Sequence, residues 1–177
     1  MTRRITTAIL VLLLFAAGTV AQTDRRIEAI NTLRAKIDKD IARSEAEPEY
    51  SNIYLTELAV NKNNGSYPAV GIYRPVVKFY YTYGDREKEP YPNRLLKIVV
   101  DIDRSDRKEH SEFFFNKSEE LVFYFEQKDN RERRMYFIRG KELRPDLRRD
   151  RSRTVIIAAV LKEKVKLVAI FRRSLEF

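Results

Sequence analysis

The side chains that could do chemistry gather between residues 101 and 111. Asp101, Asp103, Asp106 and Glu109 form an acidic cluster, and His110 follows it directly. Residues two apart on a strand lie on one face, so Asp101 and Asp103 could share a metal ion or divide the roles of acid and base. The same pattern is typical of a charged strand end and hairpin turn, and we favour this structural interpretation. The catalytic alternative is a small glycan-acting hydrolase that uses Asp101, Asp103 and Glu109.

Other kinds of catalytic site find less support in the sequence. The chain has one histidine, so no site can draw two histidines from it. Ser105 and Ser111 are close to His110 in sequence, but neighbouring strand residues point to opposite faces, which separates a serine nucleophile from its base. A calcium loop would need a glycine at its bend and a spaced glutamate, and this segment has neither. We therefore predict no metal, no cofactor and no enzymatic activity.

Residues 1–21 have the pattern of a secretory signal peptide. Arg3 and Arg4 give a positive start, Ile9 to Ala17 form an apolar run, and small residues precede Gln22. The run is too short for a bilayer, which needs about 20 residues. We therefore expect cleavage near Ala21 and a mature chain without a transmembrane segment, located in the periplasm or outside the cell. Residues 22–177 have the length of a single domain, and since they contain no cysteine the domain must be held by burial alone.

The chain is basic, and its basic residues are unevenly distributed. The formal net charge of +9 becomes +7 when Arg3 and Arg4 leave with the leader, and the segment from Arg131 to Arg153 holds ten basic and four acidic residues. Such a patch suggests nucleic acid in a cytoplasmic protein. In an exported protein we expect lipid headgroups, lipopolysaccharide, a cell-wall polymer or another protein instead, and a solvated surface that aids solubility is the alternative. The candidate binding residues are Arg131, Arg133, Arg134, Arg139, Lys141, Arg144, Arg148 and Arg149.

A helix is predicted over Asp24 to Glu45, with Thr23 able to cap its start. Its apolar residues follow one another in steps of three and four, which places them along one side, and charged residues cover the other sides. The helix should therefore lie on another element. The apolar residues are Ile27, Ile30, Leu33, Ile37 and Ile41.

The tail from Thr154 to Phe171 fits two elements. As a helix it collects an apolar side opposite Lys162, Glu163, Lys166 and Arg173. As a hairpin it would turn at residues 162–164, and its many β-branched residues suit a strand. We favour the helix because the apolar stripe is wide. Its apolar side would be formed by Ile157, Val160, Leu161, Val165, Val168, Phe171 and Leu175.

Between these segments the hydrophobic period changes to two, and aromatic and β-branched residues dominate, which is typical of strands. The clearest alternation sets Leu96, Ile98 and Val100 against Lys97 and Asp101 and predicts a sheet with one dry and one wet face. The connections are short, so consecutive strands should pair as an antiparallel meander. The predicted strands are Ile53 to Asn61, Val70 to Tyr83, Arg94 to Asp103, Lys108 to Asn116, Leu121 to Gln127 and Arg133 to Ile138.

Two segments repeat at a spacing of 22 residues. Residues 113–115, followed by Glu120 and Leu121, align with residues 135–137, followed by Glu142 and Leu143. Each copy predicts an aromatic strand, a polar turn and the opening of the next strand. With its flanking helices this meander resembles a group of small uncharacterised exported bacterial α+β proteins. The hairpin copies are faintly similar to MORN-type repeats, but the glycine pairs of those repeats are missing, and neither resemblance implies an active site.

Together these patterns predict an α+β domain in which about six antiparallel strands pack against an N-terminal helix and a C-terminal helix. Both helices are expected to cover the same face of the meander. For function they predict an exported, non-enzymatic binding module for an anionic partner.

Overall fold

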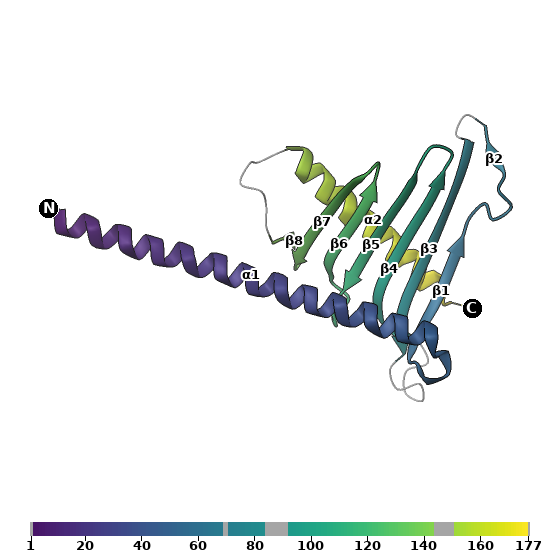
Figure 1. The fold of residues 1–177 in the computed structure, drawn as a ribbon, viewed down its shortest axis with the longest axis horizontal. Coiled ribbons are helices and arrows are strands. Elements are labelled where there is room, and N and C mark those ends of the chain that lie inside the picture. Colours follow the sequence, from purple (N-terminus) through teal and green to yellow (C-terminus); the bar gives the residue numbers. More distant parts are fainter. Residues whose placement is uncertain (1, 69–70, 84–91, 144–150, 177) are drawn as a thin grey trace.

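The computed structural model describes residues 2–68, 71–83, 92–143 and 151–176 (Figure 1). For residues 2–21, 92, 93 and 151 it describes the backbone alone. Two long helices enclose a sheet. The elements are α1 (Thr2–Ala46), a short 3-10 helix η1 (Pro48–Tyr50), β1 (Ile53–Ala59), β2 (Ser66–Tyr67), β3 (Gly71–Tyr83), β4 (Pro92–Arg104), β5 (Lys108–Phe115), β6 (Leu121–Lys128), β7 (Arg131–Ile138), β8 (Lys141–Glu142) and α2 (Arg151–Arg173).

The strands form an antiparallel sheet in the order β1-β3-β4-β5-β6-β7-β8, with β2 paired to the far end of β3. The six predicted strands and their meander connectivity are confirmed. The short strand β2 was not predicted. Strand β8 contains Glu142, the position at which the 22-residue repeat predicts that a strand begins. Aromatic β5 and β7 each end in a turn, and Asn116 closes the first turn by donating its N–H to the Glu120 carbonyl.

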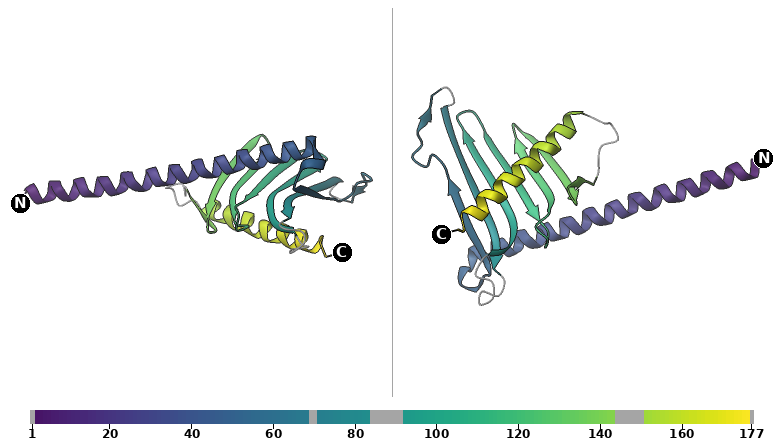
Figure 2. Two further views of the ribbon diagram at one scale, coloured as in Figure 1. Left: turned by 90° about the horizontal axis from the view of Figure 1, so that it is seen from below. Right: turned by 180° about the vertical axis from the view of Figure 1, so that it is seen from behind.

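The two helices lie on opposite faces of the sheet, which corrects the expectation that they share one face (Figure 2). The reason is that both faces of the strands carry apolar side chains. Phe113 and Phe115 pack on the α2 side, and Phe114 between them packs on the α1 side. A sheet with two dry faces needs two covers, and each helix supplies one.

The core under α2 is built from aromatic rings. Phe171 of α2 is fully buried, and its ring centroid lies 5.4 Å from that of Phe79 and 5.1 Å from that of Tyr81. Val160 and Leu167 of the same helix are also buried there. The prediction of a C-terminal helix is therefore confirmed, but Val165 is 61% exposed and does not belong to its buried side. The reason is that Val160, Leu167 and Phe171 define the side of the helix that faces the sheet, and Val165 lies on another side.

The core under α1 is smaller and includes two cations. Ile30, Ile37 and Ile41 of the helix are buried on the sheet. The Arg34 guanidinium lies 3.6 Å from the centroid of the Phe123 ring, a cation–π contact. Lys97 of β4 is the second cation and is 8% exposed. Helix α1 thus covers the sheet with apolar residues and with charges that need partners.

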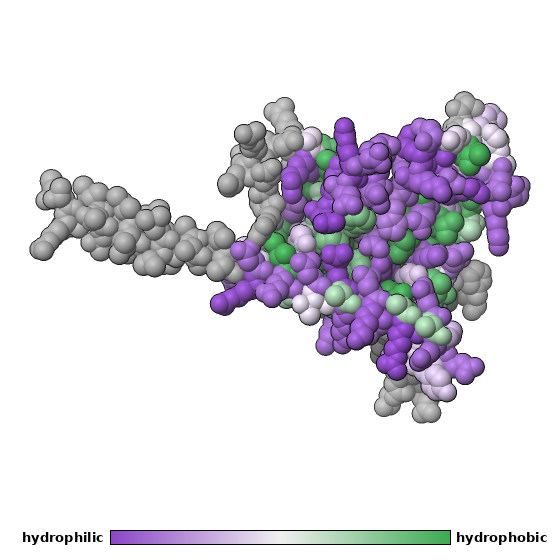
Figure 3. Space-filling model, in the orientation of Figure 1, coloured by the Kyte–Doolittle hydropathy of each residue, from purple (hydrophilic) through white to green (hydrophobic). Residues whose placement is uncertain are grey.

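Strand β4 does not alternate as its sequence suggests, so the expectation of one dry and one wet face is wrong. The pairing with β3 shifts register at Tyr80, which faces Lys97, and Tyr81, which faces Leu95. This bulge places Leu96 on the α1 side, away from Ile98 and Val100 on the α2 side. The α1 side is dry where the helix covers it. Where the sheet extends past the helix, its surface is mostly hydrophilic (Figure 3).

Helix α1 begins at Thr2 and runs without interruption to Ala46, so the predicted start at Asp24 is too late. Residues 8–21 consist largely of Ala, Leu, Val and Thr, with a single glycine and no proline, and nothing there stops a helix from continuing into the packed segment. Among the residues that the structure describes, no helix combines the length and the apolar character needed to cross a membrane.

Candidate functional site

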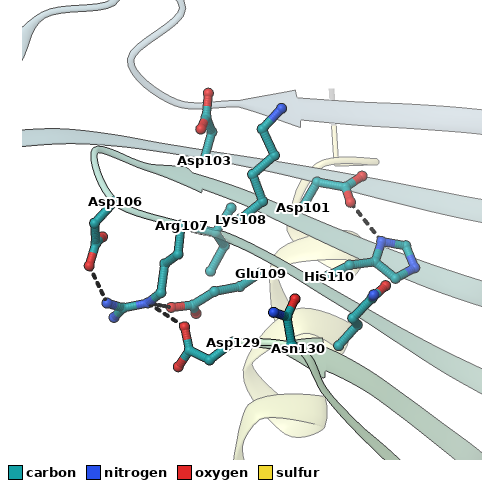
Figure 4. Close-up of a pocket in the computed structure, with 11 residues that line it drawn as sticks. Asp101, Asp103, Asp106, Arg107, Lys108, Glu109, His110, Asp129 and Asn130 are labelled. Carbon is teal, nitrogen blue, oxygen red and sulfur yellow. Dashed lines mark hydrogen bonds and ion pairs between the residues drawn. The ribbon is translucent and has the colours of Figure 1, made fainter.

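The acidic cluster and His110 surround a hollow where β4, β5 and β6 extend beyond α1 (Figure 4). The cross-strand register decides which of them can meet. Asp101 lies opposite His110, and Asp103 lies opposite Lys108, all on the α1 side. Glu109 lies opposite Ile102 and Lys128 and therefore points to the α2 side. The three carboxylates of the hydrolase hypothesis are divided between the two faces of the sheet.

On the α1 side the structure shows a row of alternating charges that sequence reasoning did not assemble. His110 Nδ1 lies 2.7 Å from Asp101 Oδ1, and His110 Nε2 lies 3.6 Å from Glu112 Oε1. Lys97 Nζ lies 2.6 Å from the same Glu112 oxygen and 2.8 Å from Asp38 Oδ1 of α1. We call these five residues the charged row. It links the middle of the sheet to the helix that covers it.

The charged row shifts the pKa values of its members in opposite directions. Burial alone would raise the pKa of Glu112, but His110 and Lys97 outweigh it and lower this pKa to about 2. The interaction with Glu112 raises the pKa of His110, burial opposes the rise, and Asp101 reinforces it. The row therefore stabilises a charged imidazolium between two carboxylates.

We expect the protein to be less stable at about pH 8.5 than at about pH 5.5 because of His110. Its pKa is raised on folding, so its contribution is complete below the ordinary value of 6.5 and is lost as the pH rises through the folded pKa. Glu112 has a lowered pKa, so its contribution persists at both pH values and disappears only as the pH falls from 4.5 towards 2. Urea unfolding at the two pH values measures the difference.

The variant His110→Gln is the control for this pH dependence. Glutamine keeps a side chain that can bond to Asp101 or Glu112 but has no charge to lose. The stability difference between the two pH values should shrink relative to that of the original protein. An undiminished difference in His110→Gln would assign the pH dependence to other groups.

The remaining acidic residues of the cluster are paired with cations. Asp103 forms an ion pair with Arg74. Glu109 Oε1 lies 2.7 Å from Arg107 Nε, 2.9 Å from Arg104 Nε and 3.2 Å from Lys128 Nζ. Burial alone would raise the pKa of Glu109, but these partners lower it, which is the opposite of what a general acid needs.

This arrangement fits the structural interpretation of the cluster better than the hydrolase alternative. At the hairpin turn Arg107 Nη1 lies 2.9 Å from Asp106 Oδ2, an ion pair that is typical of a charged turn. Among the residues that the structure describes, no three His, Asp or Glu side chains group closely enough to hold a metal ion.

The predicted basic residues that the structure describes lie on both faces of the sheet and in the turn after β7. On β7, Arg133 lies opposite Glu126 and pairs with it on the α2 side. Arg131 is two residues earlier and shares that side. Arg134 points to the other side, and its Nη2 lies 2.8 Å from Glu132 Oε2. Arg139 lies in the turn after β7 and Lys141 in β8, both exposed. The predicted residues Arg144, Arg148 and Arg149 lie outside the described residues.

A different basic surface occurs on the outer side of α2. Lys162, Lys166 and Arg173 are exposed there, as are the aliphatic side chains of Val155 and Val165. The helical period of the sequence places the three cations opposite the buried side, and the structure confirms this. Sequence reasoning nevertheless did not include them as binding residues, because the density of basic residues is higher between Arg131 and Arg153.

No protein-family model matches the chain, and no curated protein or solved structure is detectably similar to it. The resemblance to small exported bacterial proteins and to MORN-type repeats therefore stays a prediction.

Proposed function

We propose that the chain is an exported, non-enzymatic binding module that contacts an anionic partner through the outer side of α2. The single observation that carries the proposal is the charge of this helix, which has seven basic residues and one acidic residue, Glu163. Arg153 and Arg172 are used inside the fold, since they pair with Glu142 and Glu119. The outer cations remain for a partner.

An anionic lipid surface fits this side of α2 best. Lys166 Nζ lies 3.8 Å from Glu163 Oε2, a long ion pair between two exposed side chains, and Lys162 and Arg173 project from the same side of the helix. Val155, Val165 and Ile170 are exposed next to these cations. Basic and aliphatic side chains together suit the boundary between lipid headgroups and acyl chains. Lipopolysaccharide and cell-wall polymers offer the same phosphate chemistry without the apolar layer.

The proposal is tested by reversing the charge of the outer cations. The variant Lys162→Glu/Lys166→Glu/Arg173→Glu should bind vesicles that contain phosphatidylglycerol at least about 100-fold more weakly, since each lost cation contributes about 1 kcal/mol near an anionic surface and each new carboxylate is repelled by it. Binding of the original protein should weaken as salt is raised from about 50 mM to about 500 mM, because screening shortens the reach of surface charges. Vesicle co-sedimentation measures both effects.

The matched control is Lys36→Glu/Lys39→Glu/Arg43→Glu, which makes the same change of net charge on exposed positions of α1. It should retain most of the binding. Equal losses in the two variants would mean that overall charge, and not α2, attracts the surface. Binding that ignores ionic strength would rule out the electrostatic mechanism.

A further inference from the structure

Strand β1 is an exposed, apolar edge of the sheet. It is the terminal strand in the sheet order, and it pairs with β3 only on one side. Figures 1 and 2 show it at the margin of the molecule, with β3 on its inner side and no strand of the described residues paired to its outer side. Leu55 is 47% exposed and Leu58 is 41% exposed, and the two point to opposite faces. Exposed apolar side chains on both faces are a feature of strands that pair with another strand.

The backbone groups of β1 that face outward follow from its pairing with β3. Val60 donates its N–H to the Pro75 carbonyl, and hydrogen-bonded positions alternate along an antiparallel pair. Leu58, Thr56 and Tyr54 therefore bond to β3, and Leu55, Glu57 and Ala59 direct their N–H and C=O groups outward. Ile53 also faces outward, but its N–H donates to Ser51 Oγ and its carbonyl accepts from Ser44 Oγ. The free stretch of the edge therefore runs from Leu55 to Ala59.

The opposite edge of the sheet is protected. Strand β7 is partly covered by β8, and the rest of it carries Arg131, Glu132, Arg133 and Arg134. Charged side chains on an edge discourage pairing with another strand. Strand β1 has one charged residue, Glu57, and neither lysine nor proline. Of the two sheet edges formed by described residues, the β1 edge is the one with the features of a strand that accepts a partner.

We propose that two copies of this chain pair through β1 in antiparallel orientation, with Thr56 opposite Thr56 of the second copy. This register places Leu55 opposite Glu57 and Tyr54 opposite Leu58. Leu55 and Glu57 exchange backbone hydrogen bonds on each side of the two-fold axis, and the two sheets become one continuous sheet.

Charge and hydrogen bonding select this register over its neighbours. A shift that sets Glu57 opposite Glu57 places like charges directly across the pair, which is destabilising. The opposite shift sets Leu55 opposite Leu55 and Ile53 opposite Glu57, where the Ile53 backbone is already bonded to Ser44 and Ser51. With Thr56 at the axis, each Glu57 has an apolar residue across from it, and Lys78 is its neighbour on β3.

Single cysteines test the pairing and its register, because the chain has no cysteine of its own. Thr56 would occupy a non-hydrogen-bonded pair, whose Cα atoms are about 4.5 Å apart and within reach of a disulfide. Two copies of Glu57, or of Leu55, would lie diagonally at about 7–8 Å, which is too far. Under mild oxidation, Thr56→Cys should therefore form a disulfide-linked dimer at least tenfold faster than Leu55→Cys or Glu57→Cys.

A second pair of variants separates pairing from misfolding. Leu55→Lys/Leu58→Lys should convert the dimer to a monomer in light scattering while circular dichroism stays unchanged. The matched control Val155→Lys/Val165→Lys changes two similarly exposed aliphatic residues of α2 and should stay dimeric. A protein that is monomeric at all concentrations, a dimer that survives the β1 variant, or equal cross-linking at the three cysteine positions would each overturn the proposal.

Discussion

Replacing Phe171 by alanine is expected to lower the free energy of unfolding by about 3–5 kcal/mol, the range for deleting a fully buried aromatic ring. Phe171 has no exposed surface, stacks on Phe79 and packs against the tilted ring of Tyr81. The ring is large and its neighbours belong to a strand that is held on both sides, so the cavity cannot close by a small shift. Urea unfolding monitored by far-ultraviolet circular dichroism measures the loss.

The control for this prediction is Val165→Ala on the same helix. Val165 is exposed, and alanine is a better helix former than valine, so stability should change by less than about 0.5 kcal/mol. The two variants together separate packing on the sheet from the helical propensity of α2. A loss below about 1 kcal/mol in Phe171→Ala would contradict the placement of α2 on the sheet.

Replacing Lys97 by methionine is expected to lower the free energy of unfolding by about 2–4 kcal/mol. Methionine keeps the length and the apolar stem but removes the cation that Glu112 and Asp38 share. Breaking a fully buried pair costs about 3–5 kcal/mol. We expect slightly less because the Asp38 side chain is partly exposed and can be hydrated. Thermal or urea unfolding near neutral pH gives the value.

A second substitution shows that the loss comes from an uncompensated charge. In Lys97→Met/Glu112→Gln the buried carboxylate is gone, so much of the lost stability should return. Lys108→Met changes an exposed lysine on the same face of the sheet and should have little effect. If Glu112→Gln gives no recovery in the Lys97→Met background, the cost arises from packing and not from the charged row.

The strands could be predicted because their pattern is local. Aromatic and β-branched residues alternate between short turns, and from β3 to β7 the predicted elements agree with the structure within a few residues at each end. The faces could not be predicted in the same way. One bulge in β4, at Leu96 and Lys97, reverses which residues share a side, and such a bulge depends on the partner strand. The dry face under α1 could not be predicted for the same reason, because the residues that form it depend on this bulge.

The candidate site shows the same limit. The sequence places Asp101 near His110, but their contact exists because β4 and β5 set them directly opposite each other. The link from Glu112 through Lys97 to Asp38 joins residues up to 74 positions apart in the chain, and no local pattern contains it. In the basic segment, the pleat of β7 sends Arg133 and Arg134 to opposite sides. Charge density along a strand is therefore a poor guide to charge density on a surface.

The position of α2 has a consequence for how the chain matures. Helix α2 follows every strand in the sequence, yet it provides the cover for the sheet face that carries Phe79, Phe113 and Phe137. During synthesis the strands emerge before this cover exists, and exposed apolar faces of this kind promote aggregation. Chaperones that hold unfolded chains should therefore associate with the nascent chain until α2 has emerged.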